Sequence, residues 1–242
     1  MIINHRYKFI FLKTIKTAGT SLEIALSKFC GPEDVITRIN EADEAIRRQL
    51  GFRGPQNYTF QGVYGEESDN SLAAENNPGK TKEFYNHAPA QFIRANISDR
   101  LWHNYFTFCF ERNPFDKAIS LYYFRKTQHP ELPADISEHL QTTAVDLLSN
   151  WRRYTIDDQV AVDFVGRYER LSEDLETVRQ QLRLPHPLSL PRAKSNFRQD
   201  KRHYSQVLPA DSRDWIATTC AKEMNYFGYS WETVQTRVRL IS

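Results

Sequence analysis

Cysteine, glycine and long apolar runs are all scarce in this sequence of 242 residues. The three cysteines are odd in number and far apart, which excludes a disulfide framework and a zinc knuckle and favours buried free thiols. No segment approaches the roughly 18 apolar residues of a membrane-spanning helix, and the N-terminus lacks the apolar stretch of a signal peptide. We therefore expect a soluble, cytoplasmic protein with no membrane span.

An excess of charge of either sign is also missing, because 32 Lys and Arg residues face 30 Asp and Glu residues. A nearly neutral chain has no bulk field for nucleic acid, so its basic residues must act locally if they bind anions. The length fits one domain with a sizeable core. We expect a single domain over residues 1–242 with a loop-rich insertion at about 51–86, where five of the nine glycines fall.

What the sequence does contain is an alternation of strand-like and helix-like segments. Three apolar, β-prone runs precede three helical patterns: strands at 7–12, 105–111 and 161–171, and helices at 20–29, 113–126 and 172–184. Further helices are expected at 43–50, at 90–97 and from about 210 to 227, with a proline-rich and then basic loop at 185–205. This order predicts an α/β fold with a central parallel sheet flanked by helices, an architecture of the phosphate-loop type.

The segment "IKTAGTSLEIAL", residues 15–26, joins the first strand to the first helix. A glycine-containing loop that opens a helix presents backbone N–H groups and a positive dipole end to an anion, and Lys16 adds a full charge. Lys16 precedes Gly19, unlike the lysine of the ATP-binding order G-x-x-x-x-G-K-S/T. On spacing alone, a plain turn capped by Thr or Ser, with solvated Lys13 and Lys16, stays open.

A second segment, "FERNPFDKAISLYY" at 110–123, repeats this arrangement of strand, charged turn and helix. Asn113 is expected to cap the helix, and Pro114 occupies its first position. Arg112 stands at the end of the strand, and Ser120 lies two helical turns further on, where its hydroxyl can share a face with the guanidinium. Arginine is suited to bidentate phosphate binding. Taken alone, Arg112 could equally be a surface or structural residue.

Together, the lysine loop and the later R-x-P…S pattern resemble the sulfotransferase family. The loop "KTAGTS" is most similar to the carbohydrate type related to heparan sulfate 2-O-sulfotransferase. "FVGRYERL" and the late basic loop "SNFRQDKRHYS" also look like motifs of this group. The resemblance reaches from residue 8 to about 205 and leaves out the insertion at 51–86.

This resemblance implies a donor, 3′-phosphoadenosine 5′-phosphosulfate (PAPS), with 3′,5′-ADP as product and no required metal. Lys16 to Ser21 would cradle the 5′-phosphosulfate, and Arg112 and Ser120 would bind the 3′-phosphate. The full set of implied cofactor-binding residues is Lys13, Lys16, Thr17, Ala18, Gly19, Thr20, Ser21, Arg112, Ser120, Lys201, Arg202 and Tyr204. The acceptor would carry a hydroxyl group and, by analogy with the carbohydrate type, would be a glycan.

Two residues are expected to be catalytic. Sulfuryl transfer depends on in-line positioning and charge stabilisation, and Lys16 fits the charge on the leaving oxygen. His87, in "FYNHAPAQF", follows the insertion where related carbohydrate enzymes have their catalytic histidine, and an imidazole titrating near neutrality suits a general base. A merely structural histidine is the alternative, with Glu111 and Glu83 as reserve bases.

Two other functions compete with sulfuryl transfer. A phosphate-loop kinase is suggested by "VAVDFVG" at 160–166, which imitates a Walker B strand with Asp163 as the Mg²⁺ partner, although the missing G-K-S/T counts against it. A non-catalytic binder of sulfated or phosphorylated glycans would keep the fold without turnover. The presence of Lys16 and His87 argues against that reading.

Overall fold

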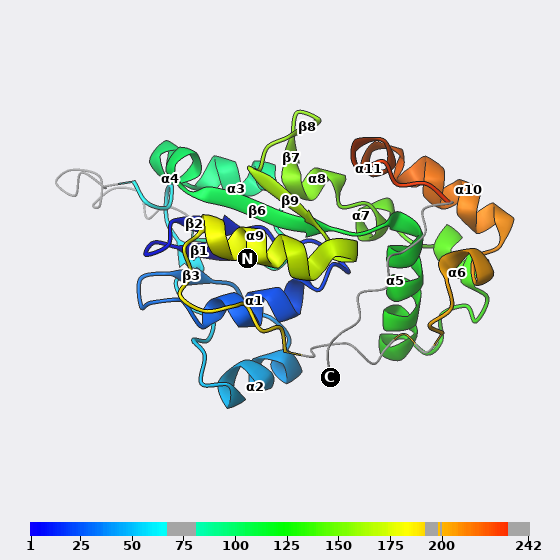
Figure 1. Cartoon of the computed structure of the whole chain (residues 1–242), viewed down its shortest axis with the longest axis horizontal. Coiled ribbons are helices and arrows are strands. Elements are labelled where there is room, and N and C mark those ends of the chain that lie inside the picture. Colours follow the sequence, from blue (N-terminus) through cyan, green and yellow to red (C-terminus); the bar gives the residue numbers. More distant parts are fainter. Residues whose placement is uncertain (67–80, 192–197, 199, 232–242) are drawn as a thin grey trace.

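Five strands form the central sheet of the computed structural model, which describes residues 1–66, 81–191, 198 and 200–231 (Figure 1). Their order across the sheet is β3 (Val35–Ile36), β1 (Ile2–Asn4), β2 (Phe9–Phe11), β6 (Phe106–Glu111) and β9 (Phe164–Arg167). β2, β6 and β9 pair in parallel, whereas β1 is antiparallel to both β2 and β3. The fold is therefore mixed α/β. The expected parallel sheet is confirmed for β2, β6 and β9, whereas the antiparallel strand β1 was not expected.

Alternation of side chains along the strands builds a core on each face of the sheet. Phe9, Phe11, Phe108 and Phe110 face one side, where they pack with apolar residues of α1 (Gly19–Ser27) and α9 (Leu171–Gln181). The other face packs against three short helices: α3 (Ala90–Asn96), α4 (Asp99–Asn104) and α8 (Trp151–Tyr154). Helices therefore cover both faces of the sheet, as predicted.

A third apolar cluster lies beyond the end of the sheet where β6 runs into α5 (Pro114–Gln128). Figure 1 shows α5 to the right of the sheet. The other helices around this cluster are α6 (Ile136–Gln141), α7 (Val145–Leu148), α10 (Ala210–Thr219) and α11 (Ala221–Phe227). The single closing helix expected at 210–227 is thus two helices, because Cys220 leaves the helical conformation with φ −109° and ψ 27°.

Most predicted elements are confirmed with shifted ends. The Asn113 side chain accepts from the Phe115 amide at 3.0 Å, and Pro114 opens α5 as predicted. The strand expected over 161–171 is shorter, since only Phe164–Arg167 pairs and a 3₁₀ turn follows. All three cysteines are free thiols, as expected, and two of them are buried. The remaining short elements are α2 (Glu41–Gln49), β7 (Thr155–Ile156), β8 (Gln159–Val160), η1 (Tyr168–Arg170) and η2 (Tyr204–Gln206).

The insertion at 51–86 is only partly a surface loop. β4 (Thr59–Phe60) pairs with β5 (Lys82–Glu83), and the Phe60 ring stacks on Phe84 with centroids 4.3 Å apart. Both rings are buried in the core, so the ends of the insertion are anchored by packing, while 67–80 lie outside the described residues. Within the part of the chain that the structure describes, no helix is long and apolar enough to cross a membrane.

Candidate functional site

The two predicted anion-binding segments meet at the carboxyl ends of β2 and β6. These strands are parallel neighbours, so the loops that follow them leave the same edge of the sheet. Nη1 of Arg112 donates a hydrogen bond to the carbonyl of Lys16 at 3.2 Å. Ser120 is half-buried on α5, and Phe124, one turn later, has its ring 4.2 Å from Nζ of Lys16. The structure therefore brings Lys16 and Arg112 together, and Ser120 lies on the same helix as Phe124, one turn before it.

The lysine loop enters α1 without a capping side chain. The N-cap residue is Ala18, in the left-handed conformation at φ 63°, so the reading in which Thr or Ser caps this helix is wrong. The Thr17 hydroxyl instead lies 2.7 Å from that of Thr14, inside the loop. Gly19 lets the start of α1 lie close to Thr14, because a Cβ at residue 19 would be only 3.0 Å from the Thr14 carbonyl oxygen. The side chain of the N-cap residue therefore accepts no hydrogen bond from the first turn of α1, at the positive end of the helix dipole.

Lys13 lies behind this loop rather than in it. Its ammonium is 2.9 Å from Oε2 of Glu23 in α1, and both side chains are buried. Burial acts to raise the pKa of Glu23, but Lys13, the Met1 amino group and Arg47 outweigh it and lower that pKa to about 2. We therefore leave Lys13 out of the proposed ligand set, since its charge already balances a buried carboxylate.

Arg112 is held by a carboxylate that the sequence analysis missed. Nε of Arg112 donates to Oδ2 of Asp116 at 2.7 Å, and the guanidinium lies 4.1 Å from the ring centre of Tyr168. The other carboxylate oxygen of Asp116 is bound by Arg198, which comes from the late basic loop. Burial acts to raise the pKa of Asp116, but the two guanidiniums lower it below its usual range. The available signal was the acidic residue in the first turn of α5, four positions after Arg112.

The three residues predicted from the late basic loop take different positions. Lys201 and Arg202 are exposed, and Arg202 pairs with Asp200. Tyr204 is buried, with its ring 5.3 Å from that of Phe115 in the third cluster. We leave Tyr204 out of the ligand set because its ring is part of the core. Residues 192–197 and 199 lie outside the described residues.

His87 is brought to the start of the lysine loop. Its Nδ1 lies 3.1 Å from the carbonyl of Lys13, and Arg153 donates to the His87 carbonyl at 2.7 Å. A carbonyl only accepts, so Nδ1 carries the proton and Nε2 keeps its lone pair. Burial, then Lys13 and Arg153, lower the pKa of His87 to about 3. The imidazole is therefore neutral near pH 7, and the expectation that it titrates near neutrality is wrong.

The reserve bases lie in contrasting places. Glu111 is fully buried at the end of β6, where it accepts from Nζ of Lys117 at 2.8 Å and from Asn150 at 3.2 Å. Burial raises its pKa, although Lys117 acts in the opposite direction. Glu83 is exposed on β5. Asn150 was missed, because nothing in its local sequence signals a contact with the lysine loop.

The position of Asp163 contradicts the kinase reading. Its Oδ2 accepts from the amide and the hydroxyl of Thr107, at 2.7 and 2.8 Å, beside the amino end of β6. Arg112 and Lys16 lie beyond the carboxyl ends of the parallel strands. Four residues of strand, at about 3.3 Å each, separate the levels of Thr107 and Glu111 by roughly 13 Å. Asp163 therefore cannot act as a Walker B residue at the lysine loop.

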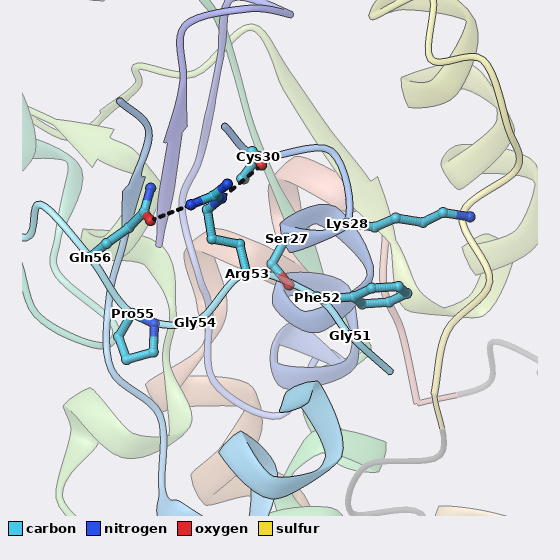
Figure 2. A pocket seen from close by; sticks show the side chains of 9 residues that line it. All are labelled: Ser27, Lys28, Cys30, Gly51, Phe52, Arg53, Gly54, Pro55 and Gln56. Carbon is cyan, nitrogen blue, oxygen red and sulfur yellow. Dashed lines mark hydrogen bonds between the residues drawn. The ribbon is translucent and has the colours of Figure 1, made fainter. Parts of the chain in front are cut away.

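The described residues offer no alternative metal site, and a surface hollow among them lies away from the two anion-binding segments. They contain no group of three or more His, Cys, Asp or Glu side chains that could hold a metal ion. A surface hollow of about 420 Å³ lies between the C-terminal end of α1 and residues 51–56 (Figure 2). Arg53 there donates to the Cys30 carbonyl at 3.2 Å and to Gln56 at 3.4 Å. None of the predicted site residues lines this hollow.

Comparisons with known proteins agree with the chemistry of the two segments. A curated relative from Archaeoglobus fulgidus, named only as an uncharacterized protein, is 33% identical over 105 residues, which is 42% of this chain and 88% of the relative. No solved structure matches the chain. The model of the sulfotransferase family matches residues 1–230, which include the lysine loop, Arg112, Ser120 and His87. The chain therefore belongs to the sulfotransferase family.

Proposed function

We propose that this protein transfers a sulfuryl group from PAPS to a hydroxyl group of an acceptor. The observation that carries the proposal is the hydrogen bond of 3.2 Å from Arg112 to the carbonyl of Lys16, which joins the two anion-binding segments. A donor with a 5′-phosphosulfate and a 3′-phosphate presents two anionic groups to one site. Two adjacent cationic segments at one sheet edge suit such a molecule.

The residues present fit that donor. The N-terminus of α1 has no side-chain cap, which leaves its dipole end for the 5′ anion beside Lys16. Arginine has five N–H groups, and Arg112 uses one on Lys16 and two on Asp116. Its remaining N–H groups, with the hydroxyl of Ser120, form the proposed contacts to the 3′-phosphate. Lys201 and Arg202 stay as proposed outer contacts.

His87 and Lys16 divide the chemistry between them. PAPS would supply the sulfuryl group as its S–O bond to the 5′-phosphate breaks while the acceptor oxygen bonds to sulfur. Nε2 of His87 accepts the proton of the acceptor hydroxyl, since Nδ1 is already committed to the Lys13 carbonyl. The ammonium of Lys16 offsets the charge that develops on the leaving 5′-phosphate oxygen.

A sugar hydroxyl is the acceptor that we favour. The motif "KTAGTS" supports the carbohydrate type. Tyr85, two residues before His87, is 44% exposed and packs on Phe92 with ring centroids 5.0 Å apart. An exposed aromatic face close to the proposed base suits the apolar face of a sugar ring.

A sulfate-transfer screen tests the proposal. Protein and ³⁵S-labelled PAPS would be incubated with glycans, phenols and alcohols, and products would be examined by mass spectrometry for an added sulfo group. We expect transfer to a hydroxyl acceptor, release of 3′,5′-ADP and no transfer by Lys16→Ala. Binding of PAPS without any transfer would favour the non-catalytic binder, and absence of PAPS binding would reject the proposed function.

A further inference from the structure

Asn150 clamps the residue that directly precedes Lys16. Its Oδ1 accepts from the amide of Ile15 at 2.8 Å, and its Nδ2 donates to the carbonyl of the same residue at 3.0 Å. Asn150 is fully buried and comes just before α8, so this contact joins positions 135 residues apart. One side-chain amide thereby satisfies both backbone polar groups of Ile15.

The clamp acts beside a strained residue. Lys16 has φ 61°, in the left-handed region that residues with a Cβ rarely adopt. Such conformations persist where the surroundings over-determine them. Asn150 donates to the Ile15 carbonyl, in the peptide before Lys16, and Arg112 donates to the carbonyl of Lys16 itself. Side chains from two distant elements therefore hold Lys16 from both sides.

Asn150 is itself firmly held. Its second Nδ2 hydrogen is given to Oε1 of Glu111 at 3.2 Å, and that carboxylate is paired with Lys117 at 2.8 Å. The backbone amide of Asn150 donates to Glu223 at 2.9 Å. Both N–H groups of the side-chain amide are thus used, which fixes its orientation. A buried network with this many partners leaves the clamp little freedom to move.

We propose that Asn150 is a positioning residue that sets the direction of the Lys16 ammonium toward the 5′ end of the donor. This role rests on the proposed function, because it matters only if Lys16 meets the phosphosulfate. Asn150 itself touches neither donor nor acceptor and acts through the Ile15–Lys16 peptide. The role differs from a general contribution to folding, since its effect depends on the presence of the lysine side chain.

A double-mutant cycle tests this dependence. Isothermal titration calorimetry would measure the Kd of PAPS, 3′,5′-ADP and 5′-AMP for the wild type, Asn150→Ala, Lys16→Ala and the double variant. We expect Asn150→Ala to weaken PAPS binding about tenfold. It should weaken the binding of 3′,5′-ADP and of 5′-AMP by the same factor as each other, since the substitution acts at the 5′ end and these two ligands differ only in the 3′-phosphate. In the Lys16→Ala background it should add less than a twofold loss. Asn104→Ala, an exposed amide on α4, is the matched control.

Losses that simply multiply in the double variant would overturn the positioning role and leave the proposed function standing. Wild-type protein that binds neither PAPS nor 3′,5′-ADP would reject both. If Asn150→Ala does not fold, Asn150→Asp keeps the shape of the side chain. Its carboxylate can accept from Ile15 but cannot donate, whereas the protonated form can. Its PAPS affinity relative to the wild type should therefore recover as the pH falls, and a constant ratio would contradict the proposal.

Discussion

Arg112 donates a hydrogen bond to the backbone carbonyl of Lys16 across 96 positions of the sequence. The bond makes one side chain part of both anion-binding segments. A ligand that binds the guanidinium of Arg112 therefore also affects the loop that contains Lys16. This coupling is the physical reason to expect that a nucleotide with two separate phosphates binds better than one with a single phosphate.

The product nucleotide should stabilise the protein without added metal. At about 100 times its Kd, 3′,5′-ADP should add about 2.7 kcal/mol of apparent stability, because it binds only the folded state. For a domain of this size the melting temperature should rise by roughly 5–10 °C. Differential scanning fluorimetry with EDTA present measures the shift. A shift produced by ATP with Mg²⁺ and not by 3′,5′-ADP would contradict the assignment.

Arg112→Ala and Ser120→Ala should impair recognition of the 3′-phosphate selectively. Each loses a donor to that group, so the Kd of 3′,5′-ADP should rise about tenfold or more. The Kd of 5′-AMP should change less than threefold in Ser120→Ala. In Arg112→Ala it should rise by a smaller factor than the Kd of 3′,5′-ADP, because this variant also loses the bond to the Lys16 carbonyl. Calorimetric titration of both nucleotides gives the ratio. The exposed residues Arg152 and Ser172 provide the matched controls Arg152→Ala and Ser172→Ala. Equal losses for the two nucleotides would show that Arg112 and Ser120 support the loop and do not bind the 3′-phosphate.

His87→Asn should abolish most turnover with little effect on nucleotide binding. Asparagine tolerates the positive φ of 63° at this position better than alanine does, so the backbone is preserved. Loss of a positioned base should lower kcat by about 10²–10⁴, with the Kd of 3′,5′-ADP within a few-fold of the wild type. Steady-state sulfate transfer measures kcat, with the exposed His129→Asn as control. A variant of near wild-type rate would remove His87 from the mechanism.

The pH dependence of the wild-type rate should show no limb from His87 near neutrality. Its pKa is lowered to about 3 by burial and by the charges of Lys13 and Arg153, so the proton-accepting form prevails above that value. The rate should therefore be flat in this respect from about pH 5 to 8 and fall only in stronger acid. A limb near pH 6.5 that disappears in His87→Asn would show that the donor-bound site raises this pKa.

Substitutions of Lys13 and of Lys16 should have clearly different effects on the free energy of unfolding. Lys13→Met leaves Glu23 with a buried charge short of a partner and should cost about 3–5 kcal/mol of unfolding free energy. Lys16→Met should cost less than Lys13→Met, since the contact of Lys16 with Phe124 is worth about 1 kcal/mol, while it should impair PAPS binding. Urea unfolding measures both variants. Equal stabilities for the two would contradict the structural role of Lys13.

The same buried cluster should shape stability in acid. The pKa of Glu23 lies at about 2 in the folded protein, below its ordinary value of 4.5. A depressed carboxyl pKa stabilises the fold above pH 4.5 and loses that contribution as the pH falls toward 2, by roughly 3 kcal/mol in all. Urea unfolding at a series of pH values should show this loss in the wild type and a smaller one in Glu23→Gln.

Local sequence was sufficient for most of the elements and for the two anion-binding segments. Asn113 and Pro114 predicted the start of α5, and the apolar, β-prone run at 105–111 predicted β6, because capping and strand propensity are local properties. Strand β1 was not predicted, since a strand of three residues is too short to show a sequence pattern. Phe60 and Phe84 were expected in a loop because packing between distant rings leaves no mark on local periodicity.

By itself, the sequence determined that a lysine loop and an arginine turn would each follow a strand and open a helix. These features depend only on residues that are neighbours in the chain. Tertiary structure alone decided which charges are available to a ligand. Lys13 and Lys16 lie three residues apart, yet one is buried against Glu23 and the other lies on Phe124. The pKa of His87 and the clamp of Asn150 on Ile15 were decided in the same way. Burial, ion pairing and hydrogen bonding between residues far apart in the chain depend on distances that exist only once the sheet has formed.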